Sequence, residues 1–279
     1  MRAAPTPVLI RATVAAARNA EGLLYDARVL ADAGSAARAC SLAALAVEET
    51  GKAGNLGILT VMPRALRARA PVGRMLEWHQ LKQVHGLFLA TAPCRVPEMA
   101  SWLAALPAGE LAQVLTDLDL PVDEADRLKR RGLYAEVGRG GLIREPSEIT
   151  EAEVLSQLTR AGQAVSAAAQ LLEAETQAWL VSPPAEMVEL SRAAVSALTE
   201  ARYARTPEAA TNVLLKAVSN FRDQMAVREA EGTSAPSELR HRSTRRTQRG
   251  FAPRSASPGR TWRGCLSYRA VGQNSQSDP

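Results

Sequence analysis

Apolar residues recur at the spacing of an α-helix along most of the chain. From residue 8 to residue 33 they keep close to the 3.6-residue period, at Ile10, Val14, Ala17, Leu24, Ala27 and Leu30. Gly34 and Ser35 end this helix and start a second one, which runs over residues 36–62 until Pro63 stops it. The pattern predicts two long helices joined by a two-residue turn, and such helices pack antiparallel.

Further helices follow an arginine-rich connector at residues 64–73. A third helix is predicted over residues 74–91, with an apolar stripe at Met75, Trp78, Leu81, Val84 and Phe88. Residues 98–131 predict two or three shorter helices, punctuated by prolines 107 and 121. Residues 131–146 have the glycines of a loop and predict at most a short extended piece.

The last helices have clear start signals. Thr150 with Glu153 forms a capping box, and this helix is predicted to reach about residue 180. Helices over 185–204 and 207–230 follow, the last capped by Thr206 with Pro207 at its first position. We therefore predict an all-α protein: a helical bundle over residues 8–180, additional helices over 185–231 that pack on the bundle, and a tail over 232–279.

Composition agrees with helix and places the charge in the tail. Only 4% of the 279 residues are aromatic, and alanine and leucine abound, which favours helix over sheet. The net charge is +5, but the segment from Gly232 onward holds nine arginines and two acids, so the preceding residues carry −2. The Ser- and Arg-rich tail is predicted to be disordered, either as an RNA-contacting arm or as an extension without a role.

The cysteines and the apolar runs bear on the compartment. Three widely spaced cysteines form no pair motif, which favours a reducing, cytoplasmic setting. No apolar run reaches the length that a transmembrane helix needs, so no membrane partner is expected.

The second helix carries charges among its apolar residues. Glu49 and Lys52 fall on a stripe that has leucines at both ends, and Glu48 lies four residues before Lys52. Unpaired burial of such charges is expensive, so they need partners or a wet cleft. Gly51 lowers helix stability by about 1 kcal/mol relative to alanine and is expected to admit another backbone closely.

The first helix offers a partner face for these charges. Asn19 and Asp26 are seven residues apart, two turns along one side, and are predicted to meet the Glu49–Lys52 segment. Polar groups buried in this way can fix the register of a bundle, and we favour that role for them over direct catalysis.

The third predicted helix is chemically richer. His79 and Lys82 are three residues apart and adjoin on the helix surface, and Arg74 lies five residues before His79. A histidine carries protons near neutral pH, and an arginine clamps a phosphate that gains charge. The competing interpretation is a hydrogen-bonded helix histidine and a solvated arginine. His85 lies on another side and receives no role.

Other chemistry has no support in the pattern. The GRGG segment at 138–141 lacks the strand and lysine of a P-loop, and no nucleophile motif is present. No cluster has metal-ligand spacing. We predict neither a cofactor nor a metal.

Five ordered segments resemble one protein family: NAEGLLYDARVL (19–30), LAVEETGK (45–52), HQLK (79–82), KRRGLYAEV (129–137) and EPSEIT (145–150). They are similar to the AbiV-type abortive infection proteins, a branch of the HEPN superfamily of helical bundles. The second segment matches the family's Glu-Glu-x-Gly-Lys, and the third its His-x-x-Lys. The resemblance covers roughly residues 8–180.

The resemblance implies a function. Many HEPN proteins are metal-independent ribonucleases and toxins that carry Arg-x4–6-His, which maps onto Arg74 and His79, although Met75 stands where active members have a polar residue. Such proteins often form homodimers that bring two motifs together. Lys82 would add charge, and Glu49 with Lys52 would shape the cleft. RNA would be the substrate, in a phage-infected cell, with a phage or host protein as trigger.

A binding role remains the alternative. In that hypothesis the bundle senses a phage or host protein without catalysis, and the polar face supports the fold. The nearly neutral charge of residues 1–231 favours this alternative, because RNA affinity comes mostly from basic contacts to phosphates. Arginines in the connector before residue 74 supply a local basic patch that weakens the objection.

Overall fold

The computed structural model describes residues 4–92, 98–134, 136–137, 143–144, 149–200 and 206–230. Its elements, in chain order, are α1 (Thr6–Asp32), α2 (Ala36–Val61), α3 (Arg64–Arg69), α4 (Val72–Glu77), α5 (His79–Thr91), α6 (Met99–Ala105), α7 (Ala108–Thr116), α8 (Asp119–Leu133), β1 (Glu136–Val137), β2 (Ile143–Arg144), α9 (Glu151–Ala169), the 3-10 turn η3 (Gln170–Leu172), α10 (Ala174–Val181), α11 (Ala185–Glu200) and α12 (Pro207–Ala230). The prediction of an all-α fold is confirmed.

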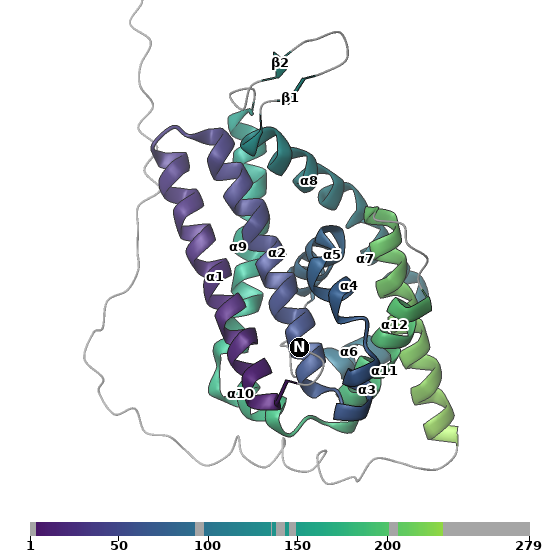
Figure 1. The fold of residues 1–279 in the computed structure, drawn as a ribbon. Coiled ribbons are helices and arrows are strands. Elements are labelled where there is room, and N and C mark those ends of the chain that lie inside the picture. Colours follow the sequence, from purple (N-terminus) through teal and green to yellow (C-terminus); the bar gives the residue numbers. More distant parts are fainter. Residues whose placement is uncertain are drawn as a thin grey trace, which may run out of the picture. The chain divides into compact units, whose positions relative to one another are not determined.

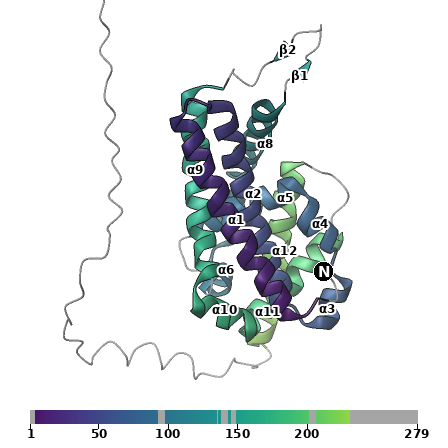
Figure 2. The same cartoon turned by 60° about the vertical axis from the view of Figure 1, so that its left-hand side comes forward.

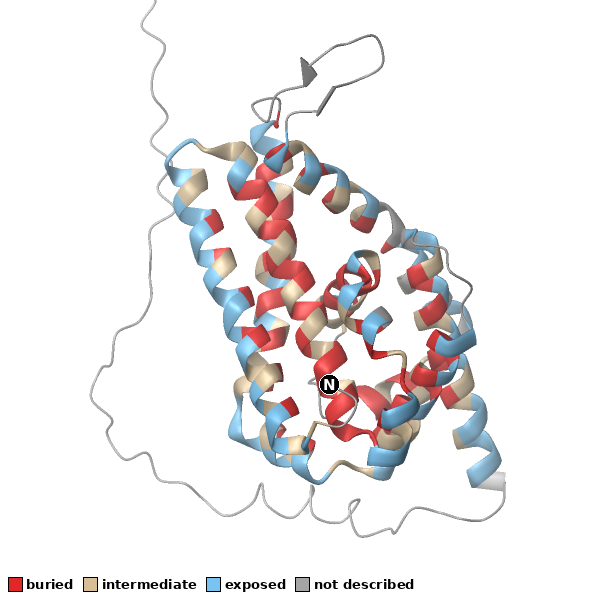
Figure 3. Ribbon diagram, in the orientation of Figure 1, coloured by how far each residue is buried: buried red, intermediate tan, exposed pale blue. Residues whose placement is uncertain are grey.

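Helix α2 is the centre of the bundle. It contacts α1, α5, α8, α9, α10 and α11 and is buried along most of its length, whereas α1 and α12 each keep an exposed face (Figure 3). In both ribbon views α1 and α9 run alongside α2 (Figures 1 and 2). A helix with neighbours on most sides buries many of its polar groups, and those groups need partners within the protein.

The α1–α2 hairpin forms as the turn signals predict. Gly34 has φ of 76°, and the amide of Ser35 donates to the carbonyl of Leu30 while the amide of Gly34 donates to Ala31. This is a Schellman motif, which places glycine in the left-handed conformation after the last helical turn. The two helices therefore turn back on each other within a few residues.

The predicted helix over residues 74–91 is wrong in one respect, because it breaks at Trp78 into α4 and α5. Trp78 has an extended backbone, with φ of −76° and ψ of 104°. In a continuous helix the carbonyl of Met75 would accept from the amide of residue 79. Here it accepts instead from Nδ2 of the buried Asn55 on α2, at 2.7 Å. A tertiary hydrogen bond thus replaces a helical one and makes His79 the first residue of a new helix.

The helix predicted from Thr150 to about residue 180 is also interrupted. Its capping box is present, since the amide of Glu153 donates to the Thr150 hydroxyl and the Glu153 carboxylate accepts from the amide of Thr150. However, α9 ends at Ala169, and after η3 an extended Glu173 starts α10. Leu171 is buried in this bend, and α10 turns back onto α1 and α2, so core packing outweighs helix continuation.

The middle and late elements follow the sequence with smaller differences. The connector at 64–73 contains a short helix, α3. The shorter helices predicted over residues 98–131 are present as α6, α7 and α8. Pro121 lies in the first turn of α8, where a missing amide hydrogen is tolerated. The short extended piece is the antiparallel pair β1–β2.

The C-terminal helices pack against each other and against helices from the middle of the sequence. α11 and α12 pack on each other, and α12 also contacts α5, α6, α7 and α8. As predicted, the Thr206 hydroxyl accepts from the amide of Ala209 to cap α12. The division into a bundle over 8–180 and added helices over 185–231 stays a prediction, and residues 201–205 and the tail at 232–279 lie outside the described residues. Within the described part, no helix is long and apolar enough to cross a membrane.

Candidate functional site

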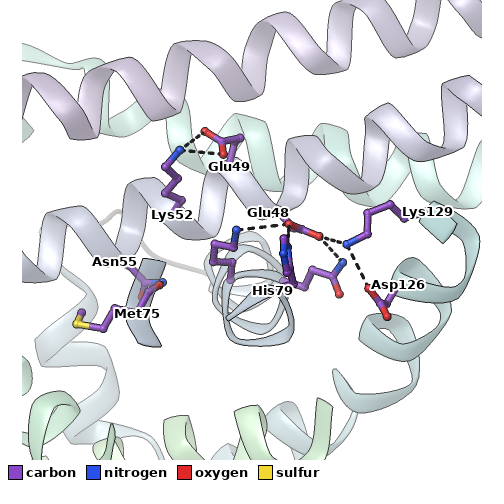
Figure 4. Close-up of polar contacts among 10 residues, drawn as sticks. Glu48, Glu49, Lys52, Asn55, Met75, His79, Asp126 and Lys129 are labelled. Carbon is purple, nitrogen blue, oxygen red and sulfur yellow. Dashed lines mark hydrogen bonds and ion pairs between the residues drawn. The ribbon is translucent and has the colours of Figure 1, made fainter. Parts of the chain in front are cut away.

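A single buried carboxylate, that of Glu48 on α2, organises the polar centre of the bundle. Glu48 is 2% exposed. Its Oε1 accepts from Lys129 Nζ at 2.5 Å and from Gln83 Nε2 at 3.1 Å. Its Oε2 lies 2.6 Å from Nδ1 of His79 and 3.5 Å from Nζ of Lys82 (Figure 4). Each carboxylate oxygen therefore has two partners.

The partners of Glu48 come from two other helices. His79, Lys82 and Gln83 lie on the first turns of α5, where spacings of three and four residues put them on one face. Lys129 lies on α8 and also pairs with Asp126, whose Oδ1 is 3.2 Å from Nζ. Figure 4 shows α5 and α8 on either side of this carboxylate. The network ties three helices together through one anion.

Glycines let α2 approach α5 and α8 closely. A Cβ on Gly51 would lie 1.7 Å from the carbonyl oxygen of Lys82, and a Cβ on Gly86 would lie 2.4 Å from that of Val47. The expected close backbone approach at Gly51 is thus confirmed, and its partner is α5. The crossing of α2 with α8 has the same design, because a Cβ on Gly132 would meet the carbonyl of Ala37 at 2.2 Å.

Gly51→Ala is expected to destabilise the protein by about 1–3 kcal/mol or more, since the new methyl group overlaps backbone atoms that cannot rotate away. The matched control is Gly57→Ala on the same helix, where a Cβ meets nothing within 4 Å. That variant should gain about 0.5–1 kcal/mol from better helix propensity. Urea unfolding measures both, and equal stabilities for the two variants would contradict the close crossing.

The charges in the network shift each other's protonation. Burial by itself would raise the pKa of Glu48, but the Lys129 ammonium and the hydrogen bonds from Lys129 and His79 outweigh it and hold that pKa below its usual value. For Lys129, burial acts to lower the pKa, and the Glu48 and Asp126 carboxylates overcome it, so the pKa is raised. Both groups are therefore charged at neutral pH.

His79 has one nitrogen engaged and the rest of its ring accessible. Its side chain is 57% exposed, yet Nδ1 faces the buried Glu48. Because Glu48 is ionised it can only accept, so Nδ1 carries the hydrogen and donates it. The other nitrogen, Nε2, is then the acceptor of the neutral ring. A carboxylate that fixes the tautomer of an exposed histidine is the arrangement that general-base catalysis uses.

Arg74 lies in α4, and its side chain is outside the described part of the structure. The predicted convergence of Arg74 and His79 therefore stays a prediction. The two residues do not share one helix, because Trp78 separates α4 from α5.

Other predicted site residues fall elsewhere. Glu49 and Lys52 form a pair of their own, with both carboxylate oxygens 3.1 Å from Nζ, and the lysine side chain is 36% exposed. The expectation that Asn19 and Asp26 meet this pair is wrong, since both are exposed. The buried residues of α1 are small or apolar: Leu9, Thr13, Ala16, Ala17, Ala20, Leu24 and Ala27. Close packing of these alanines turns the polar side of α1 outward.

The sequence pattern did not indicate the central role of Glu48 or the contribution of Lys129 and Gln83. Lys129 lies in the family-like segment KRRGLYAEV, but 81 residues separate it from Glu48. The helical period put Glu49, and not its neighbour Glu48, on the apolar stripe. The spacing therefore predicted burial of Glu49, whereas the structure buries Glu48. The signal that was available for Lys129 was the family-like segment itself.

His85, which received no role, is part of the interior. Its Nδ1 lies 2.7 Å from Oδ1 of Asn55, whose Nδ2 donates to the Met75 carbonyl. The amide oxygen must accept, so Nδ1 carries a hydrogen and donates it. Burial lowers the pKa of His85 to about 4.

This depressed pKa predicts acid sensitivity. The unfolded chain binds a proton at His85 near pH 6.5, whereas the folded chain does so only near pH 4. Stability should therefore fall as the pH drops between these values, by about 3 kcal/mol at most. His85→Gln removes the titration, and its urea stability should change less over this window. An unchanged slope in that variant would refute the assignment.

Comparison with known proteins identifies the family. The family model for AbiV proteins of the HEPN class matches residues 8–166, which is more than half of the chain and includes every member of the Glu48 network. No curated protein and no solved structure matches the chain. On this match, the chain belongs to the HEPN AbiV family, which supports a role in phage defence by abortive infection.

Proposed function

We propose that this protein cleaves RNA during abortive infection and that His79 transfers the proton in the reaction. The observation that supports this best is the state of the imidazole: Nδ1 is held by a buried carboxylate at 2.6 Å while the side chain is 57% exposed. A histidine with only a structural role has no need of an open second nitrogen. General acid–base catalysis requires one.

The chemistry uses the RNA's own nucleophile. The 2′-hydroxyl gives its proton to Nε2 of His79, and its oxygen forms a bond to the adjacent phosphorus. The bond from phosphorus to the 5′-oxygen breaks, and that oxygen takes a proton from a second acid, which we assign to the imidazolium of a second copy of the chain. The products are a 2′,3′-cyclic phosphate and a 5′-hydroxyl. The family resemblance gives Arg74 the non-bridging oxygens.

The start of α5 suits a phosphate. His79 is its first residue, and the helix has neither a side-chain cap nor an acid in its first turn. Free amide hydrogens and the helix dipole favour an anion at such an end. Lys82 contributes little to binding RNA directly, because it is 7% exposed and faces Glu48. Its role in the proposal is to keep Glu48 ionised and in place.

Binding without catalysis is the second candidate function. The observation in its favour is that Glu48 already has Lys82, Lys129 and Gln83 as partners, so the network also makes sense as a device that sets helix register. In this case His79 is a surface contact for a phage or host protein.

Incubation of the purified protein with RNA in EDTA separates the two candidates. The nuclease proposal expects fragments with 2′,3′-cyclic phosphate ends, and the same cuts in total RNA from a bacterial host that expresses the protein. Intact RNA in both experiments, together with capture of a specific phage protein that depends on His79, would favour binding alone. Arg74→Ala tests the second half of the motif in the same assay.

A further inference from the structure

A second polar feature lies at another end of the bundle, around Arg67 on α3. This arginine is 4% exposed, and its Nε and Nη1 are buried with no hydrogen-bond partner among the described residues. Buried guanidinium groups are normally paired, because an uncompensated buried charge is strongly destabilising. Arg67 therefore needs an explanation that its protein neighbours do not supply.

Arg67 lines a pocket of about 400 Å³. The pocket lies where α1 begins, α2 ends and α3 follows, and Val181 at the end of α10 completes it. Figure 1 shows α3, α10 and the first turn of α1 at the same end of the bundle. The lining residues include neither His79 nor Glu48, so this pocket is separate from the site described above.

The lining of the pocket has one sign of charge. Its described lining contains Arg64 and Arg67 and no acidic residue. Burial lowers the pKa of Arg67, and the nearby positive charge of Arg64 lowers it further. An anion between the two guanidinium groups would offset their repulsion and accept the hydrogen bonds that Arg67 does not make within the protein.

The start of α1 adds to the same field. Ala4, Pro5 and Thr6 line the pocket, and α1 is a 27-residue helix without a side-chain cap or an acid in its first turn. Its positive dipole end therefore faces the two arginines. Guanidinium forks together with a helix N-terminus match the several oxygens of a phosphate better than the two of a carboxylate.

We infer that this pocket binds the phosphate group of a small molecule of nucleotide size. The volume is too large for a phosphate ion alone and lies in the range of small-molecule sites. Arg67 forms the buried end and Arg64 the rim. The start of α1 forms the third side, through its dipole and the amide of Thr6, since Pro5 and Pro7 carry no amide hydrogen. The ligand would join α1 to the α2–α3 corner and so stabilise the folded chain.

Thermal unfolding with inorganic phosphate and with adenosine monophosphate tests this site, against sodium chloride at equal ionic strength. Both ligands should raise the Tm of the wild type, and the nucleotide should do so at lower concentration, because it also fills the rest of the pocket. Arg67→Met should abolish the shift, and Arg64→Met should weaken it. Arg69→Met is the matched control, an exposed arginine of α3 that does not line the pocket, and it should keep the full shift.

The variants also protect the test from a folding artefact. Replacing an unpaired buried charge by an apolar side chain of similar length is expected to raise the Tm of ligand-free Arg67→Met. If that variant does not fold, Arg64→Met on the exposed rim carries the comparison. His79→Ala should keep the full shift, so failure of the nuclease proposal leaves this one standing. No shift in the wild type at millimolar ligand, or an undiminished shift in the folded arginine variants, would overturn the inference.

Discussion

His79→Ala is expected to lower the rate of RNA cleavage by ~10²–10⁴-fold, the range that a positioned acid–base group contributes. The loss should appear in kcat rather than in RNA affinity, because the imidazole takes part in proton transfer in the transition state and contributes little to phosphate binding. Because the side chain is 57% exposed, its removal leaves space that solvent molecules can enter. Added imidazole should therefore restore part of the rate, which a merely structural role would not predict.

Gln80→Ala is the matched control, since residue 80 neighbours His79 in the first turn of α5 and makes no contact with Glu48. It should cleave RNA at the wild-type rate. Both variants should remain folded at the assay temperature, which thermal unfolding checks. Wild-type-like cleavage by a folded His79→Ala protein would exclude the proposed proton transfer, whatever the family suggests.

Glu48→Gln is expected to destabilise the protein by about 3–5 kcal/mol, because it leaves two lysine ammonium groups facing an uncharged amide in the interior. Lys129 keeps Asp126 as a partner, at 3.2 Å, which places the expected value toward the lower end. Lys82 makes no other ion pair with a described residue and is 7% exposed, so the loss of the Glu48 charge affects it most. Urea unfolding of the variant against wild type measures the difference.

Glu49→Gln is the control for this prediction. It removes the neighbouring carboxylate, whose partner Lys52 is 36% exposed, so it should cost less than about 1 kcal/mol. A double variant, Glu48→Met with Lys82→Met, should be more stable than Glu48→Gln, because it replaces a broken ion pair by apolar contact. Equal effects of the two glutamate variants would show that Glu48 is not the centre of the network.

Acid adds a second readout for Glu48. Its folded pKa lies below the unfolded value of 4.5, so its contribution is complete above about pH 4.5 and is lost as the pH falls through the folded pKa. Glu48→Gln lacks a group that titrates in this window. Its stability should therefore decline less steeply than that of the wild type below pH 4.5.

Much of the fold follows from local signals. The 3.6-residue period located α1 and α2, and the glycine at 34 placed their turn, because a left-handed residue ends a helix wherever it occurs. Local signals could not predict the break at Trp78. The break depends on a hydrogen bond from the Asn55 side-chain amide to the Met75 carbonyl, and the two residues are 20 positions apart in the sequence.

The site shows the same division. Helical spacing brought His79 beside Lys82, and Gly51 correctly signalled a close crossing. Helical spacing also suggested Asn19 and Asp26 as partners of the charged segment. That suggestion was wrong, because α1 packs through its alanines and leaves both residues exposed to solvent. The rotation of a helix about its axis is set by what it packs against, and that is a property of the assembled core.

The chain by itself determined that this is a helical protein, where its first two helices begin and end, and which short segments mark its family. Only the tertiary structure decided that Glu48 rather than Glu49 is buried and that Lys129 reaches it from α8. It also decided that Arg67 lines a pocket with its Nε and Nη1 unpartnered among the described residues. Local signals act through the backbone over a few residues. The pairing of charges depends on desolvation, which exists only once distant helices have closed around them.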